Sequence, residues 1–284
     1  MYNMTSRFAD LHMHSTASDG MDSPVELVRK AVENGISAIA ITDHDTVLGI
    51  QYALSEANIS GIEVIPGVEF SVEFTPVMHI LGLFLDINNP SLTCNLKKVR
   101  KMRMYLMSKS FRILRDHGIS VNPQEVIRRE KYLSLKNLTN YLINANLVTC
   151  KQEADAILSD IWAEWHNSLP SPAACISLIH ACGGIAIIAH PQLLYLCDKE
   201  LKNTLTQLCA LGLDGIEVVH PEHQDEDRRK LNRWARELNL IASGGSDYHG
   251  KKKREQFPTI TSNTVIPYIK IEHMKARIEA RKQC

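Results

Sequence analysis

The chain is organised around residues 9–20, which read ADLHMHSTASDG. Residues 8–11 have the pattern of the end of a short buried strand, and a small polar loop follows. In an extended backbone His12 and His14 point to the same face, because side-chain direction alternates with period two. Asp19 brings a carboxylate one loop later. H-x-H also occurs by chance in loops, but two imidazoles and a carboxylate together indicate the beginning of a site for Zn, Mn or Fe.

Composition limits the class of protein. A chain of 284 residues suffices for one large domain or two modest ones. Lys+Arg and Asp+Glu balance at 32 each, so no overall charge attracts nucleic acid or an anionic membrane, although a local basic patch can still exist. The seven scattered cysteines contain no C-x-x-C and indicate free thiols in a reducing compartment. Because there is no signal-peptide pattern and no apolar run of about 18–20 residues, we expect a cytoplasmic protein without membrane association.

The first 85 residues repeat the order strand, polar loop, helix. Ser23, Pro24 and Glu26 form a strong helix start, and Gly35 is placed to end that helix. Residues 38–42 are continuously apolar, as in a parallel strand covered on both sides. A helix at about 47–57 and strands at 63–68 and 77–85 follow. This alternation predicts an α/β domain with parallel strands.

Residues 90–172 lack this alternation. We predict a long, basic, methionine-rich helix at 92–118 and shorter helices at 123–129 and 135–146, followed by a polar stretch at 151–165. The basic helix is either a solvated face or a grip on a phosphate-bearing substrate. The strand-and-helix pattern resumes after residue 172. We therefore interpret residues 89–172 as a helical insertion domain between two parts of one α/β domain, at 1–88 and 173–284.

Ionisable residues gather at the ends of the predicted strands, the face that carries the chemistry in α/β barrels. Nine residues share this placement: His12, His14, Asp19, His44, Glu69, His79, His190, Asp247 and His249. They are too many for one ion and suit two or three divalent ions, and nitrogen and oxygen donors without cysteine favour Zn, Mn or Fe. His220 and His223 also follow a strand end. The KKKR run at 251–254 is either a solvated loop or a rim that attracts phosphate.

The motifs are recognisable at this point. HxHSxxSDG, TDHD, PGxE, HILG, AHP, DGIEV and GGSDxHG resemble, in this order, those of the PHP (polymerase and histidinol phosphatase) superfamily. The chain is similar to its stand-alone branch of metal-dependent phosphoesterases, which includes nucleoside 3′,5′-bisphosphate phosphatases and a 5′-to-3′ exoribonuclease. The resemblance covers residues 9–85 and 173–250. It implies a distorted (β/α)7 barrel, with the small helical domain inserted, and a trinuclear metal site.

The resemblance also implies a ligand for every position of that site. The first ion would take His12, His14, Glu69 and Asp247. The second would share Glu69 and add His79 and His190. The third would be held by Asp19, His44 and His249. In such a site two ions lower the pKa of a bridging water, so that a metal-activated hydroxide attacks the phosphate ester, and they clamp the attacking and leaving oxygens.

Substrate contacts are the part of the resemblance in which this chain departs from its relatives. His223 stands where relatives have a histidine near the substrate phosphate, so we expect it to contact substrate and to be a candidate acid for the leaving group. Relatives read R-P-H in the insertion, where this chain has Lys136-Asn137-Leu138, and they place an arginine shortly after A-H-P, where it has QLLY. Lysine is not equivalent to arginine as a phosphate ligand. Lys136 is our candidate for part of that role.

The leading prediction is a metal-dependent hydrolase of phosphomonoesters. Its substrate would be a nucleotide, such as a nucleoside 3′,5′-bisphosphate, or another small phosphometabolite. A 5′-to-3′ exoribonuclease on short RNA is an alternative, disfavoured by 6% aromatic residues and zero net charge. A histidinol-phosphate phosphatase is a further one. The complete ligand set argues against a non-enzymatic metal-binding regulatory module, and an amidohydrolase would lack the Asp19 and Glu69 positions. We expect no obligate protein partner.

Overall fold

The computed structural model describes residues 7–130, 134–250 and 256–283, so the lysine-rich run at 251–254 lies outside the described residues. The chain divides into two compact units. One consists of Met1–Thr93 and Pro170–Cys284, and the other of Cys94–Leu169. Among the described helices, none is long and apolar enough to cross a membrane.

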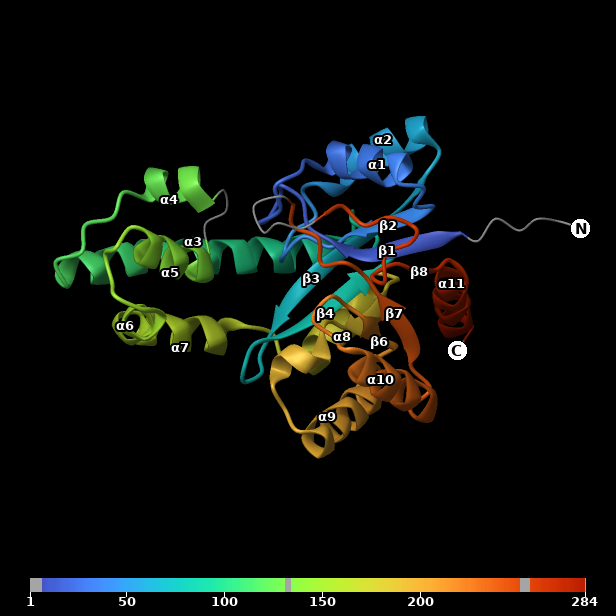
Figure 1. Cartoon of the computed structure of the whole chain (residues 1–284). Helices are drawn as coiled ribbons and strands as arrows, with labels where there is room; N and C mark the ends of the chain where they lie inside the picture. Colours follow the sequence, from blue (N-terminus) through green and yellow to red (C-terminus); the bar gives the residue numbers. More distant parts are fainter. Residues whose placement is uncertain (1–6, 131–133, 251–255, 284) are drawn as a thin grey trace, which may run out of the picture. The chain divides into compact units, whose positions relative to one another are not determined.

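The first unit is built on one eight-stranded sheet in the order β7-β6-β5-β4-β3-β2-β1-β8 (Figure 1). The strands are β1 (Phe8–Met13), β2 (Ala38–Ile41), β3 (Glu63–Val72), β4 (Met78–Leu83), β5 (Ile185–Ile188), β6 (Gly215–Val219), β7 (Ile241–Gly244) and β8 (Ile266–Pro267). Just after β7, Tyr248 forms a parallel bridge with Met13, and its carbonyl accepts from the His14 N–H at 2.9 Å. The sheet is therefore nearly closed into a barrel, and the predicted α/β barrel class is confirmed.

One strand runs against the prediction of a parallel sheet. β4 is antiparallel to both β3 and β5, with Val72 opposite Met78 and Ile80 opposite Ile188. β3 extends to Val72, so only residues 73–77 connect it to β4, whereas a parallel crossover needs a dozen or more. The start of β4 consequently lies at the edge where its neighbours end. This reversal brings His79, near the start of β4, to the edge that the other predicted ligands occupy.

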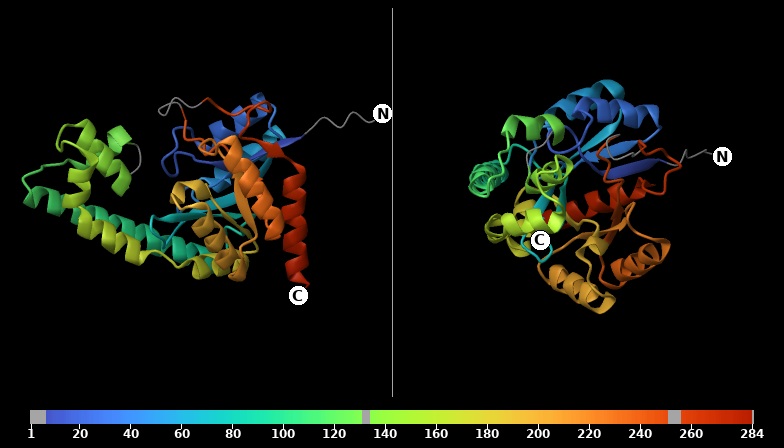
Figure 2. Two further views of the ribbon diagram at one scale, coloured as in Figure 1. Left: turned by 60° about the horizontal axis from the view of Figure 1, so that its bottom comes forward. Right: turned by 60° about the vertical axis from the view of Figure 1, so that its left-hand side comes forward.

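Helices cover the outside of the strands (Figures 1 and 2). They are α1 (Pro24–Glu33), α2 (Ile50–Ser60), α8 (Pro172–Ala181), α9 (Asp198–Ala210), α10 (Asp225–Glu237) and α11 (Ile269–Lys282), with a 3-10 turn η1 (Pro191–Leu194). The predicted start of α1 is confirmed: Ser23 Oγ accepts from the Glu26 N–H at 3.2 Å, and the Glu26 carboxylate accepts from the Ser23 N–H at 2.7 Å. Apolar residues of the strands, among them Leu11, Ile65 and Ile187, form a fully buried core beneath the polar edge.

The second unit is helical throughout its described residues. α3 (Pro90–Asp116) begins in the first unit and continues into the second, where α4 (Pro123–Glu130), α5 (Leu135–Asn144), α6 (Lys151–Ile157) and α7 (Ser159–Ser168) follow. The polar stretch expected at 151–165 is two helices that meet at Leu158, a fully buried residue. An ion pair between Lys109 and Glu164 joins α3 to α7 at 2.5 Å.

Candidate metal centre

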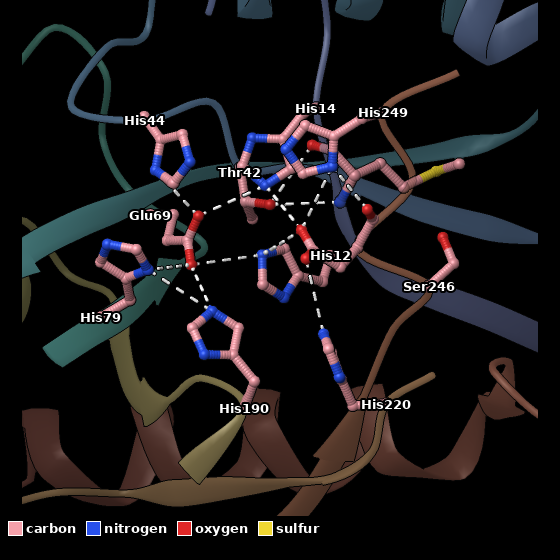
Figure 3. A network of polar contacts seen from close by, with 12 residues as sticks. His12, His14, Thr42, His44, Glu69, His79, His190, His220, Ser246 and His249 are labelled. Carbon is pink, nitrogen blue, oxygen red and sulfur yellow. Dashed lines mark hydrogen bonds and ion pairs between the residues drawn. The ribbon is translucent and has the colours of Figure 1, made fainter. Parts of the chain in front are cut away.

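All nine ionisable residues singled out from the sequence meet at one edge of the barrel. Figure 3 shows the imidazoles of these histidines, with that of His220, in one cluster with Glu69. Potential ligand atoms lie within 4.8 Å of one another in four overlapping groups: His14, Asp19, His44 and His249; His12, His14 and Asp247; His12, Glu69 and His190; and His44, Glu69 and His79. No predicted ligand is left outside these groups.

The Glu69 carboxylate is at the centre of the cluster. Its Oε1 lies 2.9 Å from Nδ1 of His79 and 2.9 Å from Nε2 of His190. Its Oε2 lies 3.0 Å from Nδ1 of His44 and 3.3 Å from Nε2 of His14. Glu69 is in β3 and almost fully buried. A carboxylate with histidines on both oxygens is suited to bridging two ions.

Asp43, which the sequence analysis left out, anchors the loop that carries Asp19. Its Oδ1 accepts from the Ser15 N–H at 2.8 Å and from the Ser18 hydroxyl at 2.5 Å, and its Oδ2 accepts from the Ser15 hydroxyl at 2.6 Å. The loop also depends on Gly20, because a Cβ there would meet the His14 carbonyl oxygen at 2.2 Å. The D in TDHD, directly before a predicted ligand histidine, was the available signal.

Asp247 reaches the cluster through a left-handed backbone conformation, with φ of +49°. For a residue other than glycine this conformation costs of order 1–2 kcal/mol and marks functional sites. Its Oδ1 lies 3.1 Å from Nε2 of His14 and 3.4 Å from Nε2 of His12. The chain runs so close to β1 here that a Cβ at Gly245 would lie 2.4 Å from the His12 Cβ.

Glu217 is the second functional residue that the sequence analysis missed. It is fully buried in β6, where Oε1 accepts from His12 Nδ1 at 3.0 Å and Oε2 accepts from the His190 N–H at 2.7 Å. Because an ionised carboxylate only accepts, the proton of the neutral His12 ring is on Nδ1, and its Nε2 lone pair is then directed at the cluster. Such carboxylates orient metal-binding imidazoles. A glutamate within the apolar run GIEVV was the signal that could have identified it.

The electrostatics of the cluster are those of opposite charges held out of water. Burial alone would raise the pKa of Glu69, but His79 and His44 hold it well below its usual range. Burial alone would lower the pKa of His14, but the nearby carboxylates of Asp247 and Glu69 raise it to about 10. Without an ion, the protein therefore keeps protons on imidazoles to balance its carboxylates. A divalent cation at the same place supplies that positive charge.

The potential ligand atoms hydrogen-bond incompletely with one another, and their chemistry suits divalent ions. Nε2 of His12, Nε2 of His14 and Oδ1 of Asp19 are buried without an aligned hydrogen-bond partner, although opposite groups lie 3.1–3.6 Å away. Each unpaired buried polar group costs about 1–3 kcal/mol. A shared cation removes that cost, and the imidazole and carboxylate donors match Zn, Mn or Fe.

Comparison with known proteins agrees with this geometry. The PHP domain family matches residues 10–181. The chain belongs to this family. A 5′-3′ exoribonuclease of Haemophilus influenzae is 34% identical over 255 residues, covering 87% of this chain and 91% of the relative. A 3′,5′-nucleoside bisphosphate phosphatase of Chromobacterium violaceum is 28% identical, covering 84% and 86%.

A solved structure supports the fold. A Bifidobacterium adolescentis protein described as a metal-dependent phosphoesterase superimposes with a TM-score of 0.76 over 95% of this chain and 96% of its own, at 24% identity. The family, the fold and the ligand groups together make this PHP chain a phosphoester hydrolase that depends on divalent metals, as predicted from its sequence.

Three further residues of this PHP chain lie outside the four ligand groups. His220 is buried, with Nε2 at 3.5 Å from Oδ2 of Asp247. His223 is also buried, its Nδ1–H donates to the Val218 carbonyl at 3.0 Å, and burial lowers its pKa. Lys136 is exposed on α5 of the second unit. Substrate contact by His223 and Lys136 stays a prediction.

Proposed function

We propose that this PHP protein hydrolyses phosphate esters of nucleotides, using two or three divalent ions held by the nine clustered residues. The observation that carries the proposal is the convergence of the nine potential ligands at one barrel edge, where buried atoms of His12, His14 and Asp19 have no hydrogen-bond partner. The ligand sets are those stated from the sequence, with Mn, Fe or Zn as the candidate metals. One refinement comes from the geometry, since His14 belongs both to the group with Asp247 and to the group with Asp19.

Divalent ions held by these residues would supply an activated water and would neutralise charge on the phosphoryl oxygens. The chain's own residues hold the arrangement. Glu217 keeps the Nε2 lone pair of His12 directed at the cluster, and Asp43 keeps the loop of Asp19 in place. His223 has its proton on Nδ1, so its Nε2 accepts rather than donates. His223 is therefore better suited to accept a hydrogen bond from substrate than to protonate the leaving group.

The exposed ring of Tyr195 favours the interpretation that the substrate carries a nucleobase. Tyr195 follows η1, is 83% exposed and has φ of +53°. It is five residues along the chain from His190, one of the predicted metal ligands. An exposed ring can stack on a base, an interaction that contributes about 1–3 kcal/mol.

A basic face on α3 favours the second candidate function, 5′-to-3′ hydrolysis of short RNA. Lys97, Lys98, Lys101, Tyr105 and Arg112 are exposed and lie on one side of the helix by their spacing. Residues 90–115 contain no acidic side chain. Cations that follow a phosphate backbone, together with an exposed aromatic ring, are typical of surfaces that bind single-stranded nucleic acid. The Haemophilus relative named an exoribonuclease agrees with this alternative.

Product analysis with defined substrates tests both functions. Protein stripped of metal and reloaded with Mn²⁺ is incubated with nucleoside 3′,5′-bisphosphates, 5′-phosphorylated RNA and histidinol phosphate. His14→Ala and Asp247→Ala should abolish turnover, whereas His273→Ala, an exposed histidine of α11, should not. Release of phosphate from a bisphosphate supports the first function, and stepwise release of mononucleotides from RNA supports the second. If metal-loaded protein releases nothing from any nucleotide ester, the proposal is wrong.

A further inference from the structure

His220 is a buried histidine of the centre for which the nine-residue ligand set has no role. It follows β6 directly, and its ring centroid lies 5.3 Å from that of His190 and 6.3 Å from that of His12 (Figure 3). It could act as a tenth ligand, as a hydrogen-bond donor within the centre, or as inert packing. Its hydrogen bonds decide among these.

The proton of His220 is on the nitrogen that faces the centre. Its Nδ1 lies 3.1 Å from the backbone N–H of Glu222, which can only donate. Nδ1 therefore carries a lone pair, and in the neutral ring Nε2 carries the hydrogen. In His12 the proton is on the other ring nitrogen, because Nδ1–H donates to Glu217. In His249 the proton is likewise on Nδ1, because Nδ1–H donates to the Asp247 carbonyl at 2.7 Å.

The Nε2–H of His220 faces the second oxygen of Asp247. Oδ1 of Asp247 lies among the nitrogens of His12 and His14, while Oδ2 lies 3.5 Å from Nε2 of His220. The turn that holds His220 is itself fixed, because Arg228 donates through Nη2 to the His220 carbonyl at 2.9 Å and through Nε to the His223 carbonyl at 3.1 Å. The Nε2–H of His220 has no aligned hydrogen-bond partner among the described residues, and it lies 3.5 Å from one carboxylate oxygen of Asp247 while the other oxygen faces the ligands.

We propose that His220 is a positioning residue. It donates a hydrogen bond to Oδ2 of Asp247 and so directs Oδ1 at the ion that Asp247 shares with His12 and His14. This inference rests on the proposed metal site, but not on the identity of the ester that is hydrolysed. Asp247 lies just after β7 in a left-handed backbone conformation, and the contact with His220 would fix which of its two oxygens faces the ligands. Ligation through Nε2 would instead require His220 to break its bond to Glu222 or to lose its only proton.

Side chains that keep or remove the donor test this role. Glutamine places an amide N–H near the position of Nε2, and asparagine places one near that of Nδ1. Metal-free His220→Gln, His220→Asn and His220→Ala are titrated with Mn²⁺ and with Zn²⁺ by calorimetry, and kcat and KM are measured in parallel. We expect His220→Ala and His220→Asn to bind one ion about 10- to 100-fold more weakly, without losing an equivalent. His220→Gln should restore most of that affinity.

The control is His180→Gln. His180 is a histidine of α8 whose Nε2 pairs with Asp214 at 2.8 Å rather than with a residue of the centre, so its replacement should leave metal affinity unchanged. Circular dichroism confirms that each variant is folded, and the donor-retaining His220→Gln keeps the test decisive if His220→Ala does not fold. Native affinity in His220→Ala would overturn the proposal, and so would loss of a whole equivalent in His220→Gln. Normal metal binding without any ester hydrolysis would contradict the proposed function but not this inference.

Discussion

Replacing Glu217 by glutamine separates the charge of this side chain from its shape. The two carboxylate oxygens accept from two different donors, His12 Nδ1 at 3.0 Å and the His190 N–H at 2.7 Å. A glutamine has one amide oxygen, so its NH₂ group must face one of these donors. If it faces His12, the His12 proton moves to Nε2 and the ligand lone pair is lost. If it faces His190, the backbone N–H of His190 loses its acceptor.

Either outcome weakens the centre by an amount that can be measured. Loss of a partner that orients a ligand lowers metal affinity by about 10- to 100-fold, which corresponds to about 1.4–2.7 kcal/mol. The metal-free protein should also unfold at lower urea, because a hydrogen bond to a charged group contributes about 1.5–3 kcal/mol. Calorimetric titration with Mn²⁺ gives the first quantity, and urea unfolding in the presence of a chelator gives the second.

Glu279→Gln is the matched control, because Glu279 is exposed on α11 and pairs with Lys282. It removes the same charge outside the centre and should leave both quantities unchanged. If Glu217→Gln binds metal with native affinity, then Glu217 does not set the proton position of His12. The orientation of the ligands would then have to come from packing alone.

Three further predictions concern the loop, the pH dependence and the substrate. Asp43→Asn should weaken metal binding and lower the unfolding free energy by about 1–3 kcal/mol. The reason is that an amide NH₂ replaces one carboxylate oxygen and then faces the Ser15 or Ser18 hydroxyl or the Ser15 N–H, which are donors. Calorimetric titration and urea unfolding measure the two effects, and native values would refute the prediction. Metal-free protein should lose stability as the pH rises from about 6.5 towards 10. The pKa of His14 is raised to about 10 in the folded protein, so His14 keeps a proton that the unfolded chain releases above the ordinary pKa of 6.5. A urea midpoint, measured in chelator, that is equal or higher at pH 9 than at pH 6 would contradict the prediction. Tyr195→Ala should raise the KM about tenfold for a nucleotide but not for ribose 5-phosphate, because only the nucleotide has a base that can stack on the ring. Tyr195→Phe should have a near-native KM, and Tyr52→Ala, at another exposed tyrosine, is the control. Equal effects on both substrates would exclude stacking.

The local elements and the ligand types could be read from the sequence because they depend on short-range rules. The Ser23–Glu26 capping box depends only on two residues three positions apart in the sequence. The apolar strands followed by polar loops are recognised from the alternation of side chains along a single strand. The same patterns placed His12, His14 and His44 at strand ends, where the structure has them. The PHP motifs added the order in which these strand ends recur.

Tertiary structure alone decided how these pieces act together. The antiparallel pairing of β4 with β3 and β5 places His79 beside Glu69. The proton positions of His12 and His220 depend on Glu217 and Glu222, and the group that His220 faces, Asp247, comes from another strand end. A sequence pattern reports the periodicity of one segment, whereas a tautomer or a carboxylate orientation is set by donors and acceptors that folding brings together from distant segments.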